Sequence, residues 1–135
     1  MTTAWSAKEL EHIGSAEELQ IAIKRADGTL RRWVPIWVVC VGGRVYVRTW
    51  YRRDNGWFGQ VLGSRRARIH VPGLEVDVAV EDVGEDKTEL HAGVDAAYHA
   101  KYDSYGPTIV GYVTGPDARL VTIRLIPSAP SRSEQ

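Results

Sequence analysis

The most informative part of this chain is PIWVVCVGGRVYVRTWYRRDNGWFGQVL, from Pro35 to Leu62. Its apolar run Ile36 to Val41 turns at Gly42-Gly43 and returns as a second strand, Arg44 to Trp50. Two such runs around a Gly-Gly pair predict an antiparallel β-hairpin, because glycine supplies the positive φ of tight hairpin turns. The run Ile36 to Val41 is apolar on both faces, which predicts an interior strand, as at the centre of a small barrel.

A cationic and aromatic cluster ends the hairpin and leads into a short helix. Its members are Arg48, Trp50, Tyr51, Arg52, Arg53 and Trp57. Guanidinium groups pair with phosphate or carboxylate, aromatic faces pack on flat rings, and a helix N-terminus favours anions. The cluster therefore predicts an anion-binding corner for a planar ligand. The alternative is a hairpin edge kept soluble by charge, with Trp and Tyr filling the core or an interface.

Composition indicates an ordinary globular protein. The 135 residues are 44% apolar and 25% charged, which predicts one domain over residues 1–127, followed by a disordered Pro/Ser-rich tail, 128–135. Lys plus Arg and Asp plus Glu are equal at 17 each, so the basic surplus of a nucleic-acid or acidic-membrane binder is missing. No apolar stretch reaches membrane-spanning length and the N-terminus is too polar for a signal peptide, so we expect a cytoplasmic protein.

Catalytic motifs are absent from the sequence. It contains no nucleophile elbow, Walker loop or dinucleotide fingerprint. Cys40 is the single cysteine, which excludes an internal disulfide and a zinc pattern. His91 and His99 lie eight residues apart on one predicted helix, whereas zinc pairs on a helix sit four apart. We therefore expect no metal site, and we interpret the acidic run 81–86 as a solvated strand end with a helix cap.

The first part of the chain begins with a helix start signal. Ser6 and Glu9 are spaced as a capping box, and Trp5 and Leu10 as a hydrophobic staple. A hairpin is expected across Asp27-Gly28, with a return strand from Thr29 to Val34 that Pro35 interrupts. Proline there fits an edge strand or a bulge.

The second part alternates strands and helices. We expect a helix over Trp57 to Leu62, and a longer one opened by an Asp86 and Glu89 capping box and reaching Tyr102. Strands are expected over Ala67 to Val71, Leu74 to Val83, Ile109 to Val113 and Leu120 to Ile126, the last two as a hairpin. Six or seven antiparallel strands of this kind can close into a small barrel, which removes exposed edges.

Two aromatic groups have a structural and a functional interpretation. Tyr98 and Tyr102, at i and i+4, fit packing of the helix against the core, although with Tyr105 and Tyr112 they could line a pocket. Trp33, Trp37 and Trp50 come from neighbouring predicted strands and could form one cluster, as a barrel core, a dimer interface or a cofactor floor.

The order of elements resembles the flavin- and deazaflavin-binding split-barrel superfamily, which includes pyridoxamine-phosphate oxidases and deazaflavin-dependent nitroreductases. Within it, the chain is similar to a family of small bacterial proteins catalogued as a domain of unknown function. The resemblance covers roughly Trp5 to Pro127. It rests on the segments Pro35-Ile36-Trp37-Val38-Val39, Val45-Tyr46-Val47-Arg48, Trp57-Phe58, Asp95-Ala96-Ala97-Tyr98, Lys101-Tyr102 and Thr122-Ile123-Arg124-Leu125. It implies a β-rich α+β fold, an antiparallel split β-barrel with flanking helices.

The resemblance also implies where a cofactor phosphate would bind, at the end of the second hairpin strand and in the loop before the short helix. Those positions are Arg48, Thr49, Tyr51, Arg52, Arg53 and Trp57. The deazaflavin relatives carry a Ser/Lys/Gly-rich loop there, whereas residues 51–56 hold a single glycine, so cradling by consecutive backbone amides is not expected. Either the three arginines substitute electrostatically or the loop has lost the cofactor.

The leading hypothesis is a homodimeric oxidoreductase that binds FMN or deazaflavin and reduces a small organic substrate. A cofactor carries its own hydride chemistry, so the lack of an acid–base constellation is compatible with this hypothesis. The alternatives are a cofactor-free pocket protein for a hydrophobic metabolite, such as a cyclase or isomerase of a biosynthetic pathway, and a structural or interaction module. Five tryptophans, six tyrosines and zero net charge favour a dimer, and the resemblance implies a cofactor cleft between subunits.

Overall fold

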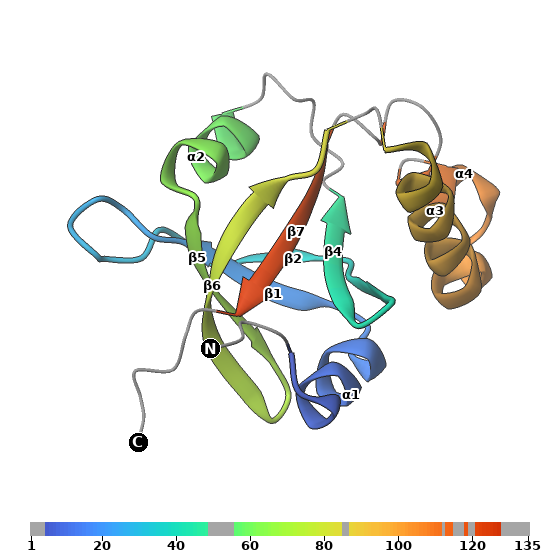
Figure 1. The fold of residues 1–135 in the computed structure, drawn as a ribbon, viewed down its shortest axis with the longest axis horizontal. Coiled ribbons are helices and arrows are strands. Elements are labelled where there is room, and N and C mark those ends of the chain that lie inside the picture. The colour runs from blue at the N-terminus through green and yellow to red at the C-terminus, as the bar shows by residue number, and fades with distance from the viewer. Residues whose placement is uncertain are drawn as a thin grey trace.

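The fold is an antiparallel sheet that curls around an apolar core, with helices outside it (Figure 1). The computed structural model describes residues 5–48, 56–84, 87–111, 113–114, 118 and 121–127, without the side chains of 56–58 and 109. Its seven strands are β1 (Leu19–Ile23), β2 (Val34–Ile36), β3 (Val39–Val41), β4 (Arg44–Arg48), β5 (Arg66–Val71), β6 (Leu74–Asp82) and β7 (Thr122–Pro127). All their pairings are antiparallel, which confirms the predicted fold class.

The curl brings the two ends of the sheet back to one short stretch of chain. The strand order is β2-β1-β5-β6-β7-β4-β3, so the outermost strands are β2 and β3. These two strands are consecutive in sequence and are joined by Trp37 and Val38 alone. The chain itself therefore links the two edges of the sheet, and this is how the barrel is closed.

The stretch from Pro35 to Leu62 behaves largely as predicted in its described part. The β3–β4 hairpin forms in the expected register, with Cys40 opposite Val45, and both turn glycines have positive φ. The prediction of one interior strand from Ile36 to Val41 is wrong, because the strand breaks at Trp37 and Val38 and its second half forms an edge of the sheet. Both faces of β3 are covered, one by the inner core and the other by a helix, although Cys40 and Val41 remain half-buried. An apolar pattern on both faces therefore did not require a central position.

The inner face of the sheet holds the main core. Alternate residues of each long strand point inward, as the period of two requires. These are Leu19, Ile21 and Ile23 of β1, Ala67, Ile69 and Val71 of β5, Val78 and Val80 of β6, Ile123 and Leu125 of β7, and Val45 and Val47 of β4. Ile13 of helix α1 (Ala7–Ser15) and Val61 of helix α2 (Gly56–Ser64) complete this core.

A second, smaller core lies outside the sheet. Helix α3 (Thr88–Tyr102) covers the outer face of β3 and β4, and continues through a 3-10 turn (Asp103–Tyr105) into the short helix α4 (Pro107–Gly111) (Figure 1). This core is formed by Trp37, Val39, Tyr46, Val83, Val94, Tyr98, Tyr102, Val110 and Val113. It brings α3 against the last residues of β4, where the sequence predicted a binding site.

The observed starts of the helices agree only in part with those predicted from the sequence. Ser6 and Glu9 form the predicted capping box of α1, with Ser6 Oγ accepting from the Glu9 N–H at 3.1 Å. Helix α3 instead takes Lys87 as its N-cap residue, with no side-chain cap bond, and Asp86 lies outside the described residues. The pattern S/T/D-x-x-E occurs at both places, so the pattern alone did not locate the second helix start.

The predicted hairpin over residues 109–126 is wrong. Residues 107–111 form α4, which Pro107 opens from the first helical position, where a missing N–H costs nothing. Strand β7 pairs with β4 and β6 instead. The expected hairpin across Asp27-Gly28 does form, because Lys24 bridges Leu30 and Ile21 pairs with Val34 at the start of β2, but its return strand is interrupted between these two points. Pro35 lies in the edge strand β2, as its missing donor predicts.

Candidate functional site

The predicted site lies between the end of β4 and the start of α2. Arg48 is the last residue of β4, and Trp57 is the second residue of α2. The structure therefore places these two ends of the site, and the side chain of Trp57 is not described. Five further site residues lie outside the described residues: Thr49, Trp50, Tyr51, Arg52 and Arg53.

Arg48 is completely buried, and all five N–H donors of its guanidinium face protein acceptors. Nε donates to Thr122 Oγ1 at 2.8 Å. Nη1 donates to a carboxylate oxygen of Asp95 and to the Val113 carbonyl at 2.9 Å. Nη2 lies 3.0 Å from His91 Nδ1 and 3.5 Å from the His91 carbonyl oxygen. A buried charge is tolerated only when it is paired and hydrogen-bonded in this way.

His91 and Asp95 contact Arg48 from successive turns of α3, because a spacing of four residues puts both on one helix face. Arg48 has no acceptor atom, so His91 Nδ1 accepts from it and Nε2 carries the imidazole proton. That Nε2–H donates to the Gly84 carbonyl, 2.6 Å away. These two bonds are those of a neutral His91 with its proton on Nε2. They also link the residues after β6 to α3 and β4.

Tyr98 completes the attachment of β4 to α3. Its hydroxyl accepts from the backbone N–H of Arg48 at 2.9 Å, and its ring lies 5.9 Å from the guanidinium carbon. Burial is the main reason that the pKa of Tyr98 is raised, so the hydroxyl stays protonated at any ordinary pH. The backbone and the side chain of Arg48 are thus both held by one helix.

These contacts give Arg48 a structural role that the sequence analysis did not foresee. To bind an anionic cofactor, the guanidinium would have to give up acceptors that already satisfy every donor. Binding of a cofactor by Arg48 stays a prediction, and so does binding by residues 49–53 and Trp57. Three partners of Arg48 occur in the segments that carried the resemblance: Asp95, Tyr98 and Thr122. His91 is not in those segments, and the sequence indicated only that it lies on a helix.

A second group of α3 side chains contacts the break between β2 and β3. Tyr102 stacks on Trp37 with ring centroids 4.0 Å apart, and Lys101 Nζ donates to the Val38 carbonyl at 2.8 Å. Burial raises the pKa of Tyr102 to about 12 and lowers that of Lys101. The tyrosines of α3 therefore serve mainly to pack and to bond the backbone, as the i, i+4 interpretation expected.

The predicted cluster of Trp33, Trp37 and Trp50 stays untested. Trp33 is 37% exposed, and Trp50 lies outside the described residues.

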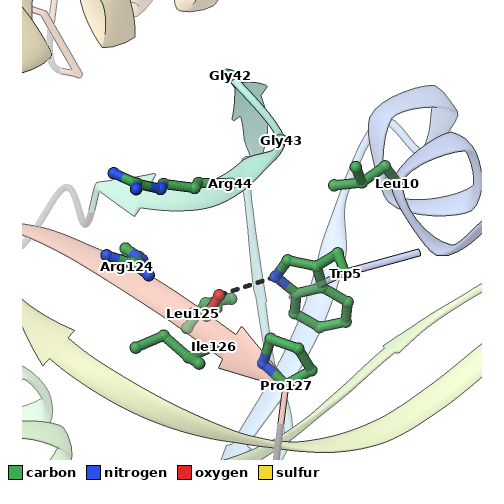
Figure 2. A pocket seen from close by; sticks show the side chains of 9 residues that line it. All are labelled: Trp5, Leu10, Gly42, Gly43, Arg44, Arg124, Leu125, Ile126 and Pro127. Carbon is green, nitrogen blue, oxygen red and sulfur yellow. Dashed lines mark hydrogen bonds between the residues drawn. The ribbon is translucent and has the colours of Figure 1, made fainter. Parts of the chain in front are cut away.

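A cavity of about 440 Å³ lies at the other end of β4 (Figure 2). It is lined by Trp5, Leu10, Gly42, Gly43, Arg44, Arg124, Leu125, Ile126 and Pro127. The two arginines of this cavity are far apart in the chain and become neighbours only through the pairing of β4 with β7, so the sequence carries no signal for it.

Neither a metal-binding group of side chains nor a membrane-spanning helix is found in the described part of the chain. Among its residues, no three His, Cys, Asp or Glu side chains gather where they could hold a metal ion. None of its helices is long and apolar enough to cross a bilayer.

Several solved structures share this fold. An F420 reductase superposes with a TM-score of 0.57 at 21% identity, over 88% of this chain and 92% of that one. An FAD-binding protein from Mesorhizobium loti gives 0.58 at 17% identity, over 93% and 91%. HutZ, a heme storage protein from Vibrio cholerae, gives 0.65 at 16% identity, over 89% and 87%. At these identities the similarity shows the fold alone, a split barrel.

Sequence comparison gives a narrower result. No match was found among curated proteins. The model of DUF2255, described as an uncharacterized protein conserved in bacteria, matches residues 9–125. That match includes every described strand up to Leu125 of β7, and the buried bonds of Arg48. The chain belongs to the DUF2255 family.

Proposed function

We propose that this protein is a reductase that binds FMN or a deazaflavin and transfers hydride to a small organic substrate. The observation that carries the proposal is the position of the cation-rich segment 49–53. It is the first part of the connection, residues 49–55, between β4, which ends at Arg48, and α2, which begins at Gly56, in a fold shared with F420- and FAD-binding proteins.

The residues of this connection suit an anionic cofactor in their chemistry. Arg52 and Arg53 are permanently charged and can each donate two hydrogen bonds to a phosphate. Helix α2 has nine residues, and its first N–H groups lack intrahelical acceptors and lie next to the segment. Thr49 adds a hydroxyl. Arg48 is not included among these donors, because its guanidinium is already saturated by protein acceptors.

In this proposal the role of Arg48 is to hold the cofactor segment in place. Its bonds to Asp95, His91 and Thr122 tie the end of β4 to α3 and β7. The first residue of the segment therefore follows a fixed point. A rigid support of this kind is what a phosphate-binding loop needs to present its donors in one geometry.

When bound, the cofactor would supply the hydride chemistry. The protein would bind its phosphate through Arg52 and Arg53 and orient its ring against the aromatic residues Trp50, Tyr51 and Trp57. Tyr98 and Tyr102 are poorly suited to proton transfer near neutral pH, because burial raises the pKa of both hydroxyls.

Titration of the full-length protein with FMN and with F420 tests the proposal. Replacing Arg52 and Arg53 together by Ala should weaken binding at least about tenfold, because a charged hydrogen bond contributes roughly 1.5–3 kcal/mol. The melting temperature should hardly change. The matched control replaces Arg31 and Arg32 by Ala, an adjacent pair after β1 with no side-chain ion pair within the described residues.

Two results would contradict the proposal. If the Arg52 and Arg53 variant binds like the parent, these arginines are only surface charge. If the parent binds neither FMN nor F420, the redox hypothesis fails, and a cofactor-free pocket protein for a hydrophobic metabolite becomes the leading one.

A further inference from the structure

The cavity at the Arg44 end of β4 has a composition that the proposed cofactor segment does not explain. Arg44 and Arg48 are four residues apart on one strand, or about 14 Å at the usual rise. The cavity therefore lies at the end of β4 away from Arg48, the residue after which the proposed cofactor segment begins. Its volume of about 440 Å³ is within the range of small-molecule sites.

One side of the cavity is cationic. Arg124 is the register partner of Tyr46, and Arg44 is two residues from Tyr46 on the same strand, so both arginines rise from the same face of the sheet. Figure 2 shows them on neighbouring strands at one edge of the cavity. Long side chains at such diagonal positions are within reach of each other, and like charges there repel.

Only one of these charges is compensated. Arg124 Nη1 lies 3.3 Å from a carboxylate oxygen of Glu81, its register partner on β6. The side chain of Arg44 is exposed and has no hydrogen bond or ion pair among the described residues. The pair therefore leaves one unmatched positive charge beside the cavity.

The opposite side of the cavity is apolar. The Trp5 indole N–H already donates to the Leu125 carbonyl at 3.0 Å, so this ring offers carbon surface alone (Figure 2). Leu10 and Pro127 extend that surface. A cationic edge facing an apolar wall is complementary to a molecule with a carboxylate at one end and a hydrophobic body at the other.

We propose that this cavity is a second site, which binds a small organic carboxylate with its anionic end between Arg44 and Arg124 and its body against Trp5. The site is independent of the proposed cofactor segment. Glu81 has a defined part in it, because its carboxylate competes with the ligand for Arg124. Removing Glu81 should therefore strengthen binding, whereas removing Arg44 should weaken it.

NMR of the full-length, ¹⁵N-labelled protein tests this proposal. The Trp5 Nε1–H resonance, assigned with Trp5→Phe, reports directly on the cavity wall. Phenylacetate should shift it in a saturable way and bind at least about tenfold more tightly than phenylacetamide, which has the same body without the charge. Inorganic phosphate and acetate, which lack the body, should also bind at least about tenfold more weakly.

Three variants make the result specific. Arg44→Gln should weaken phenylacetate binding at least about tenfold, and Glu81→Gln should tighten it severalfold. Arg66→Gln is the matched control, because Arg66 is likewise the exposed first residue of a strand, and it should bind like the parent. The proposal is overturned if phenylacetate at tens of millimolar leaves Trp5 unshifted. The proposal is also overturned if the parent binds phenylacetate and phenylacetamide equally well, or if Arg44→Gln binds phenylacetate as the parent does.

Discussion

The hydroxyl of Tyr102 accepts the backbone N–H of Val38 at 3.1 Å, at the point where the strand joining the two edges of the sheet is interrupted. The same hydroxyl donates to the Glu17 carbonyl at 2.7 Å. A backbone N–H that loses its strand partner in a buried position must find another acceptor. Helix α3 supplies that acceptor, so the outer helix is part of how the barrel closes.

Replacing Tyr102 by Phe should destabilise the protein by about 1–3 kcal/mol, because it leaves the buried Val38 N–H without an acceptor while keeping the ring stacked on Trp37. Urea denaturation followed by circular dichroism measures the change. Tyr105→Phe is the control, since Tyr105 is 44% exposed, and it should alter the free energy of unfolding by less than about 0.5 kcal/mol. Equal effects of the two substitutions would show that the Tyr102 bond contributes nothing.

Tyr102 should also make the protein sensitive to alkali. Burial raises its pKa from 10.0 to about 12 in the folded state. The folded state therefore holds its phenolic proton more tightly, and this contribution to stability is complete below pH 10 and lost as the pH rises toward 12. Urea midpoints between pH 9 and pH 11.5 should fall more steeply for the parent than for Tyr102→Phe. Parallel slopes would contradict the assigned role of this proton.

Replacing Arg48 by Met should cost about 3–5 kcal/mol, because it removes the partner of several buried groups and leaves the Asp95 carboxylate unpaired. Arg124→Met is the comparison on a neighbouring strand. It breaks an ion pair with Glu81 whose side chains are 29% and 51% exposed, and should cost less than about 1 kcal/mol. If Arg48→Met is too unstable to purify, Arg48→Lys should still be measurably destabilised, since a lysine cannot donate to all five acceptors. A stable Arg48→Met protein would refute the structural role.

The sequence predicted those elements whose determinants are local. The Gly-Gly hairpin, the Ser6 capping box and the strand that begins at Leu74 are each set by neighbouring residues, and each is found. The helical residues 107–111 were missed because a short apolar run fits a strand as well as a helix. The broken strand at Trp37 and Val38 was missed because it depends on hydrogen bonds from Tyr102 and Lys101, more than 60 residues away. The internal hydrogen bonding of the Arg48 guanidinium was missed for the same reason. Three of its acceptors, in Asp95, Val113 and Thr122, lie 47 to 74 residues away in the sequence. An arginine in a cationic cluster gives no sign in sequence of whether its partners are internal.

We propose that the protein forms a two-fold dimer. Trp33 and Tyr105 are 37% and 44% exposed, which is unusual for large apolar side chains and typical of interface residues. Zero net charge does not oppose association. Sedimentation equilibrium should give a mass twice the 15.0 kDa of one chain. A single-chain mass from micromolar to millimolar concentration would exclude the dimer.

The turn between β5 and β6 should be intolerant of any side chain at Gly73. This residue has φ +87, and a Cβ built there would lie 2.8 Å from Cε1 of the His12 ring in α1. Gly28 has φ +90 with no atom within 4 Å of the same position, so Gly28→Ala isolates the cost of the backbone conformation, about 1–2 kcal/mol.

Gly73→Ala should cost about 1–3 kcal/mol more than Gly28→Ala, because the His12 ring must also move. Adding His12→Ala to Gly73→Ala should recover that extra cost and nothing further, since the strain at positive φ remains. Thermal or urea unfolding of the three variants and the parent measures both the cost of the positive φ and the cost of the contact with His12. Equal losses for the two glycine substitutions would mean that the imidazole moves aside freely, and that the turn and α1 are not tightly packed against each other.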